Sequence, residues 1–192
     1  APTAPHIDGL PLWAHNEGGS RQIGICMPIP EYIRQIRTKI GHDLLYMPGV
    51  IAVINNAHGQ TLLQRRSDNG LWSLVGGIPD PGEEPANALA REVWEETGMI
   101  VRPTRIVGIY SEPDGAVHYP NGDVMMFLSV IFECAPVHGE PRVTDDESLE
   151  VRYFPPDQLP EMDQRHKRYL LQALRHTPQT HFVFTFKPDE KA

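Results

Sequence analysis

The sequence predicts one α/β domain in which strands and helices follow the order strands, helix, strands, helix. Three observations support this fold class. The 192 residues are enough for one domain of ordinary size with terminal extensions. Hydrophobic residues make up 40% and charged residues 22%, the mixture of a globular protein. Short β-branched runs alternate with segments whose apolar residues recur at helical spacing.

The first part of the chain, residues 1–41, is predicted to be an arm that ends in a short helix. Its first two dozen residues are rich in Pro, Gly and polar groups and show no period. Residues 31–40 then place Ile33, Ile36 and Ile40 at helical spacing, and Gly41 supplies a stop. This apolar stripe packs either on the domain itself or on another subunit.

The central part, residues 42–178, is predicted to form the domain. Residues 50–54 form a buried strand, and residues 61–66 form its hairpin partner across an intervening turn. Residues 85–97 form a helix, because Pro85 suits a first turn and Gly98 suits the position just past the end. The other expected elements are strands at residues 71–75, 100–110, 123–133 and 150–154 and a final helix at residues 163–176.

Charge and hydropathy argue against two classes of partner. Lys and Arg total 17 against 25 Asp and Glu, and a net charge of −8 has the wrong sign for holding nucleic acid by its phosphates. The longest apolar run, residues 49–54, is far short of the ~20 residues that a spanning helix needs. We therefore expect neither nucleic acid nor a membrane as partner, and a polyanionic ligand would need metal cations as go-betweens.

The cellular setting is predicted from the cysteines and the N-terminal residues. Cys26 and Cys134 have no paired spacing, and the first residues lack the pattern of a secretory signal. We therefore expect a cytoplasmic protein.

The predicted central helix carries three glutamates on one side. On a wheel at ~100° per residue, Glu92, Glu95 and Glu96 fall in one narrow sector, opposite an apolar arc around Leu89 and Val93. Like charges at this spacing repel by roughly 0.2–0.5 kcal/mol per pair, and the helix dipole disfavours anions in this half. Hard carboxylate oxygens without nearby His or Cys favour Mg²⁺ or Mn²⁺. The alternative interpretation is a solvated acidic face.

The sequence around these glutamates resembles the Nudix box at every defining position. The box is Gly, five residues, Glu, seven residues, Arg-Glu, an aliphatic, any residue, Glu-Glu, any residue, Gly and an aliphatic. The residues that fill it are Gly77, Glu83, Arg91, Glu92, Val93, Glu95, Glu96, Gly98 and Met99.

The resemblance implies the α/β/α sandwich of the Nudix family, built around a mixed β-sheet over about residues 45–176. It also implies an enzyme in which water attacks the pyrophosphate of a nucleoside diphosphate linked to another group. The metal ligands would be Glu92, Glu95, Glu96 and the backbone carbonyl of Gly76, with Mg²⁺ as cofactor and Mn²⁺ able to substitute.

Further roles are implied for the rest of the box. Arg91 would orient a glutamate by a charge-assisted bond, Glu83 would brace the loop, and Gly77 and Gly98 would be structural. The general base is either Glu92 or a later acid. For that later acid we choose Glu147, from the acidic cluster at residues 145–150, with a merely solvated loop as the alternative.

Substrate-binding residues are expected on either side of the box. Arg65 and Arg66 point to opposite faces of their strand, so that one reaches the substrate and the other is solvated. Tyr119 lies in a loop suited to stacking a base, although a plain surface turn explains the same residues. Pro113, beyond the box, resembles a proline of the ADP-ribose pyrophosphatase branch. We therefore expect ADP-ribose or a nucleotide sugar; the alternatives are a nucleoside triphosphate pyrophosphohydrolase and a non-catalytic nucleotide-binding sensor.

The last part of the chain, residues 179–192, is predicted to be a tail with a possible edge strand. Phe182, Phe184 and Phe186 alternate with other residues and would bury one face of such a strand. Together with the stripe of the first helix, this apolar material predicts a homodimer; the alternative is that both segments fold back on their own domain.

Overall fold

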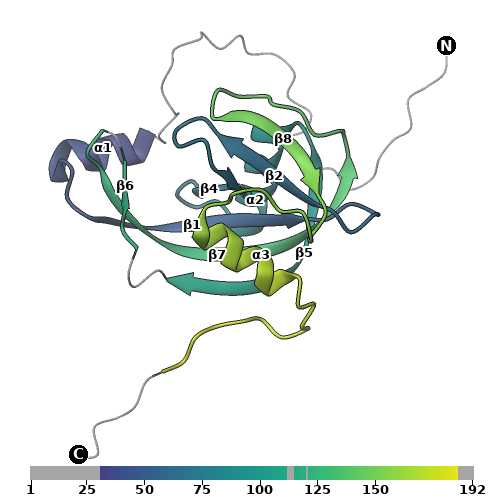
Figure 1. The fold of residues 1–192 in the computed structure, drawn as a ribbon. Coiled ribbons are helices and arrows are strands. Elements are labelled where there is room, and N and C mark those ends of the chain that lie inside the picture. Colours follow the sequence, from purple (N-terminus) through teal and green to yellow (C-terminus); the bar gives the residue numbers. More distant parts are fainter. Residues whose placement is uncertain (1–30, 112–114, 120, 186–192) are drawn as a thin grey trace, which may run out of the picture.

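Two β-sheets and three helices form the described part of this computed structural model, residues 31–111, 115–119 and 121–185 (Figure 1). The helices are α1 (Glu31–Ile40), α2 (Pro85–Thr97) and α3 (Gln164–Ala173). The larger sheet contains β1 (Leu45–Ile54), β4 (Val75–Gly77), β5 (Ile100–Ser111), β6 (Val117–His118) and β7 (Val124–His138). The smaller sheet contains β2 (Thr61–Arg66), β3 (Trp72–Ser73) and β8 (Ser148–Phe154).

The larger sheet is mixed, as predicted. Its strand order is β4-β1-β7-β5, and β6 pairs with β7 outside this path. Strands β1 and β7 run parallel over ten residue pairs, whereas β4 and β5 are antiparallel to their neighbours. This long parallel pair forms the centre of the sheet, and helices α2 and α3 pack on it.

Side-chain alternation along β1 divides the interior into two layers. Val50, Ala52 and Ile54 belong to the core that includes Leu89 and Val93 of α2. Ile51 and Val53 belong to the core that includes residues of α3. Helices α2 and α3 therefore cover opposite faces of the sheet, and the predicted α/β/α sandwich is confirmed (Figure 1).

The predicted hairpin between residues 50–54 and 61–66 is wrong. Both edges of β1 are already occupied by β4 and β7, so β2 crosses into the smaller sheet and pairs with β3 and β8. In the described residues, a single bridge between Asn55 and Thr61 is all that remains of the predicted hairpin. The expected strand at residues 71–75 also divides, because β3 and β4 belong to different sheets.

Helix α1 packs on its own domain. Ile33 is 1% exposed and contacts the buried Met47 and Met125. Arg37 anchors the helix further, because its guanidinium donates to the carbonyls of Asp43 at 2.6 Å and Val124 at 3.0 Å. The stripe thus covers the sheet of the same chain. The predicted arm at residues 1–30 and Pro113 lie outside the described residues.

The C-terminal segment differs from its prediction. His181 forms a bridge with Gly108, but no strand follows it through residue 185, and Phe182 and Phe184 are 68% and 76% exposed. The approach depends on Gly108, since a Cβ there would lie 2.7 Å from the Tyr110 ring and 3.1 Å from the His181 carbonyl oxygen. Through residue 185 the described chain therefore forms no strand that buries Phe182 and Phe184, and Phe186 lies outside the described residues.

Within the described ranges no helix is long and apolar enough to span a membrane.

Candidate active site

Helix α2 holds its glutamates in place because its ends and its buried face are well defined. Pro85 begins the helix, and Gly98 ends it in the left-handed conformation with φ 68°. The Gly98 N–H donates to the Trp94 carbonyl. Leu89 and Val93 are fully buried against the larger sheet, which fixes the rotation of the helix. The opposite side carries the carboxylates.

Glu96 is the most deeply buried of these carboxylates. The residue is 5% exposed, and its Oε2 atom has no hydrogen-bond partner among the described residues. Burial raises the pKa of Glu96 well above its usual value, and the charges of Glu92 and Glu147 raise it further. A buried carboxylate oxygen without a partner is costly, so this position is prepared for a positively charged ligand.

Glu92 lies directly against Gly77, the second residue of the pair Gly76–Gly77 that precedes the loop before α2. A Cβ on Gly77 would sit 2.3 Å from the Glu92 carboxyl carbon, so a side chain at this position would displace the Glu92 carboxylate. Arg91 donates to Glu92 Oε1 at 3.0 Å. Burial nevertheless dominates and raises the pKa of Glu92 to about 7, with Arg91 opposing the shift.

Gly76 also has no room for a side chain. Its position in β4, opposite Ile51 of β1, would bring a Cβ to 2.2 Å from the Val50 carbonyl oxygen. Together, Gly76 and Gly77 let the backbone of β4 pass closely between β1 and α2.

Arg91 joins three of the box carboxylates. It forms a bidentate pair with Glu83 at 3.0 and 2.9 Å and donates to Glu95 at 3.1 Å, in addition to Glu92. Glu83 in turn accepts from the Asp80 N–H at 3.1 Å, which ties down the loop before α2. The Arg91 guanidinium holds the pKa of Glu83 below its usual value.

Glu147 belongs to the same carboxylate site and lies in the loop directly before β8. The Asp145 carboxylate accepts from the backbone N–H groups of Glu147 and Ser148, both at 3.1 Å, and so shapes the loop. Burial, followed by the charge of Asp145, raises the pKa of Glu147. Its charge acts on both Glu92 and Glu96 and raises the pKa of each.

These residues suit a divalent cation. Carboxylate oxygens are hard ligands of the kind that Mg²⁺ and Mn²⁺ prefer, and the unpartnered Glu96 oxygen is available. Arg91 engages Glu92 and Glu95, and no three Asp, Glu, His or Cys side chains of the described residues already form a metal cage. The arrangement therefore offers ligands whose final geometry the cation would impose.

Of the two predicted arginines, Arg66 lies toward the site. Its guanidinium binds the Asp68 carboxylate at 2.9 and 2.7 Å, and its charge acts on Glu147 and Tyr119. Arg65 is exposed and donates to the Gly70 carbonyl at 3.1 Å. The pairing of β2 with β8 shifts register between the two residues, which alters the simple alternation that the sequence predicted.

Tyr119 is partly buried beside Arg66. Burial raises the pKa of Tyr119, while the charges of Arg66 and Arg165 oppose the shift. An aromatic ring on which the charges of two arginines act can stack on a base.

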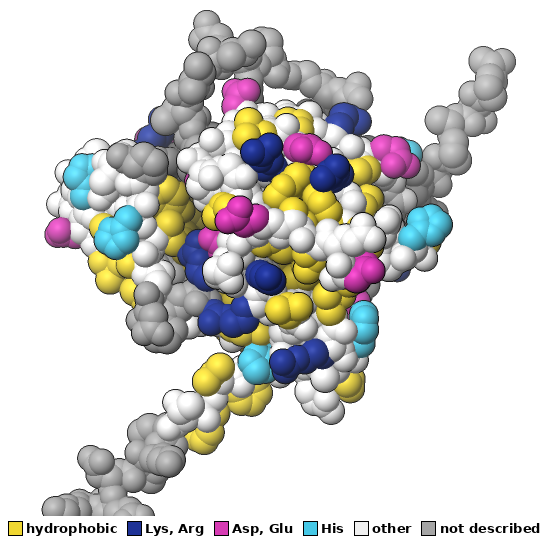
Figure 2. Space-filling model, viewed as in Figure 1, with side chains coloured by type: hydrophobic (Ala, Val, Ile, Leu, Met, Phe, Trp, Pro, Cys, Tyr) yellow, Lys and Arg dark blue, Asp and Glu magenta, His cyan; other side chains and the backbone are white. Residues whose placement is uncertain are grey.

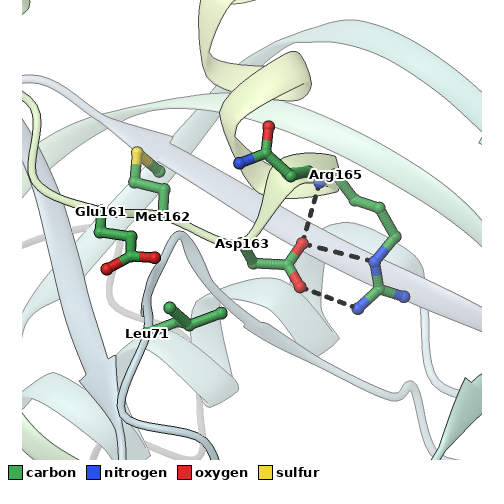
Figure 3. A pocket seen from close by; sticks show the side chains of 6 residues that line it. Leu71, Glu161, Met162, Asp163 and Arg165 are labelled. Atoms are coloured by element: carbon green, nitrogen blue, oxygen red, sulfur yellow. Dashed lines mark hydrogen bonds and ion pairs between the residues drawn. The ribbon is translucent and has the colours of Figure 1, made fainter.

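A hollow of about 380 Å³ lies at the beginning of α3, and its lining includes Glu161, Asp163 and Arg165 (Figure 3). Asp163 caps the helix through the N–H groups of Arg165 and His166. Figure 3 shows the Arg165 side chain folded back onto Asp163 beside this hollow. In Figure 2 the Lys and Arg side chains on this face are interspersed with Asp, Glu and hydrophobic side chains.

Sequence reasoning missed the residues of α3 and one buried pair. His166 accepts a hydrogen bond from the Leu74 N–H at 3.1 Å, and burial lowers its pKa to about 4, so it is neutral near pH 7. Gln64 and Ser148 are buried and hydrogen-bonded to each other. A polar Gln64 two residues after Leu62, on the same face of the strand, was the one available signal.

Comparison with known proteins agrees with this geometry. Residues 45–174 match the family model described as NUDIX domain. The chain belongs to the Nudix family. It is 34% identical over 117 residues to a MutT-like protein of Streptomyces ambofaciens, covering 61% of this chain and 69% of that protein. It is 32% identical over 136 residues to an ADP-ribose pyrophosphatase of Methanocaldococcus jannaschii, covering 68% and 76%.

A solved structure extends the comparison to three dimensions. An ADP-ribose pyrophosphatase of Streptococcus suis superposes with a TM-score of 0.55 at 26% identity, over 70% of this chain and 94% of that one. Family and fold together identify this Nudix protein as a pyrophosphohydrolase.

Proposed function

We propose that this Nudix enzyme uses Mg²⁺ or Mn²⁺ to hydrolyse the pyrophosphate bond of a nucleoside diphosphate linked to another group, namely ADP-ribose or a nucleotide sugar. The observation that carries the proposal is the buried, unpartnered Oε2 of Glu96, with Glu92 and Glu147 beside it. The choice of substrate is supported by the likeness to two proteins named as ADP-ribose pyrophosphatases.

In this proposal the chain's own residues divide the work. Glu92, Glu95, Glu96 and the Gly76 carbonyl would hold the cation, which would neutralise phosphate oxygens and lower the pKa of the attacking water. Arg91 sets the direction of the Glu92 and Glu95 carboxylates through bonds of 3.0 and 3.1 Å.

The proton of the attacking water needs an acceptor. Glu147 suits this role because burial raises its pKa and because its charge acts on Glu96. Glu92, with a pKa near 7, is the alternative base. Arg66 lies where its guanidinium offsets the charge of the substrate phosphates, and Tyr119 offers a ring to the base.

A substrate screen tests the proposal. The purified chain is incubated with Mg²⁺ and ADP-ribose, nucleotide sugars, nucleoside triphosphates or dinucleoside polyphosphates, and the products are separated by chromatography. We expect AMP and ribose 5-phosphate from ADP-ribose. Release of pyrophosphate from triphosphates would favour the second candidate, and nucleotide binding without turnover would favour a sensor.

We also propose that the chain works in the cytoplasm as a two-fold dimer. The free thiol of the buried Cys134 suits a reducing compartment. The exposed Phe182 and Phe184 provide apolar surface beyond what one domain buries.

A further inference from the structure

A buried glutamine lies in the strand that faces the carboxylates of α2. Gln64 is 3% exposed and follows Leu62 on the side of β2 that packs toward α2. The Ser148 hydroxyl, itself 6% exposed, donates to Gln64 Oε1 at 2.7 Å. Both side chains are polar groups in an interior position, and each needs a partner there.

The Ser148 bond determines which end of the Gln64 amide faces the active site. Because the amide oxygen accepts from Ser148, the NH₂ group is the end that remains for Glu96. Gln64 acts on Glu96 as a hydrogen-bond donor, whereas Glu96 Oε2 has no partner. Gln64 thus acts on the Glu96 carboxylate as a donor and lowers its pKa, while the Glu96 Oε2 atom is left for a ligand.

We propose that Gln64 is a positioning residue that holds Glu96 with its free oxygen toward the metal ion, and that Ser148 fixes the orientation of the Gln64 amide. The inference rests on the proposed metal-dependent function. It adds a link between two parts of the site, because Ser148 directly follows Glu147 and Gln64 reaches α2. The placement of the acidic loop and that of Glu96 are then coupled through one amide.

Stability alone does not require this pair. Replacing both hydrogen-bonded partners by apolar groups of similar shape is often nearly neutral, so a pair of apolar side chains at positions 64 and 148 would serve the core as well. An outer residue that orients a metal ligand, by contrast, typically affects metal affinity or activity by about 10–100-fold when it is replaced. Metal affinity therefore separates positioning from packing.

The test measures Mn²⁺ binding to the full, metal-free chain by electron paramagnetic resonance, with thermal unfolding as a check of the fold. Gln64→Met keeps the length of the side chain but removes the donor, and we expect Mn²⁺ to bind about 10–100-fold more weakly. Ser148→Ala should weaken binding less, because the amide stays in place but can rotate. The double variant should bind no more weakly than Gln64→Met alone, since Ser148 acts through Gln64.

Ser73→Ala is the matched control. Ser73 is buried opposite Gln64 in the β2–β3 pair, and its hydroxyl has no partner among the described residues. We expect this variant to bind Mn²⁺ like the wild type.

Several results would overturn the inference. Wild-type affinity in a folded Gln64→Met variant would do so, as would additive effects of the two substitutions. If Gln64→Met does not fold, Ser148→Ala decides: unchanged Mn²⁺ affinity contradicts the proposal, and weakened affinity supports it. A wild-type chain that binds Mn²⁺ tightly but hydrolyses no substrate would refute the proposed function alone, whereas a chain that binds no Mn²⁺ would refute both.

Discussion

Replacing Glu92 by glutamine should stabilise the metal-free protein and inactivate the enzyme. Burial raises the pKa of Glu92 to about 7 from its usual 4.5. At about 1.4 kcal/mol per unit, this shift corresponds to an upper limit of roughly 3 kcal/mol for the cost of ionising the side chain in the folded protein. The amide oxygen of Glu92→Gln can still accept the Arg91 bond, so the variant avoids the cost and keeps the contact.

The sign of this effect depends on pH. A carboxyl whose folded-state pKa is raised is favourable when protonated, so wild-type stability is lost as the pH rises from about 4.5 to about 7. The glutamine variant does not titrate in this window. Its gain in unfolding free energy should therefore be largest at pH 8, up to roughly 3 kcal/mol, and should vanish near pH 4.5. Turnover with Mg²⁺ should fall by about 10³-fold or more, since a ligand worth several kcal/mol is lost.

The assays are urea unfolding with chelator at pH 5 and pH 8, and initial rates of substrate hydrolysis with saturating Mg²⁺. Glu84→Gln, at the exposed start of the same helix, is the control and should change stability by less than about 1 kcal/mol. A Glu92→Gln variant that is less stable than the wild type at pH 8, or that keeps near-normal rates, would refute this assignment.

Four further predictions concern the cofactor, the pH profile, the core and the assembly. Thorough chelation should abolish turnover and Mg²⁺ or Mn²⁺ should restore it; undiminished rates after chelation would contradict the carboxylate site. Turnover should rise from pH 5 toward mildly alkaline values, because metal binding needs ionised carboxylates and the pKa of Glu92 is near 7; an optimum near pH 5 in a pH–rate profile would oppose this. Leu89→Ala should lower the free energy of unfolding in urea by about 2–5 kcal/mol, because Leu89 is fully buried on the inner face of α2. A decrease below about 1 kcal/mol would mean that the helix packs differently. Light scattering at tens of micromolar should give twice the 21.6 kDa of one chain, and Phe182→Ser with Phe184→Ser should reduce it; a concentration-independent monomer mass would exclude the dimer.

The central helix could be predicted from the sequence because its signals are local. Pro85, Gly98 and the spacing of Leu89 and Val93 specify start, end and buried face within a few turns of chain, and the structure has the same bounds. The box spacing likewise indicated the family before any fold was known. The placement of Glu147 near α2 depended on the resemblance, since the acid lies about fifty residues beyond the helix.

Strand pairing could not be predicted in the same way, because it depends on partners far apart in the chain. β1 pairs with β7 instead of its neighbour β2, and nothing near residue 54 shows that its edges are taken. The roles of Gln64 and Ser148 were hidden for the same reason, since 84 residues separate them. At the C-terminus the described chain pairs with the edge strand β5 only at His181, and Phe182 and Phe184 beyond it remain exposed.

The most direct test of the account is to follow the oxygen of water into the products. The chain is incubated with ADP-ribose and Mg²⁺ in H₂¹⁸O, and the products are analysed by mass spectrometry. The account predicts AMP and ribose 5-phosphate in equal amounts, with one ¹⁸O atom in one of the two phosphate groups and none when Glu96→Gln replaces the wild type. Intact ADP-ribose after prolonged incubation, or unchanged turnover by Glu96→Gln, would contradict it.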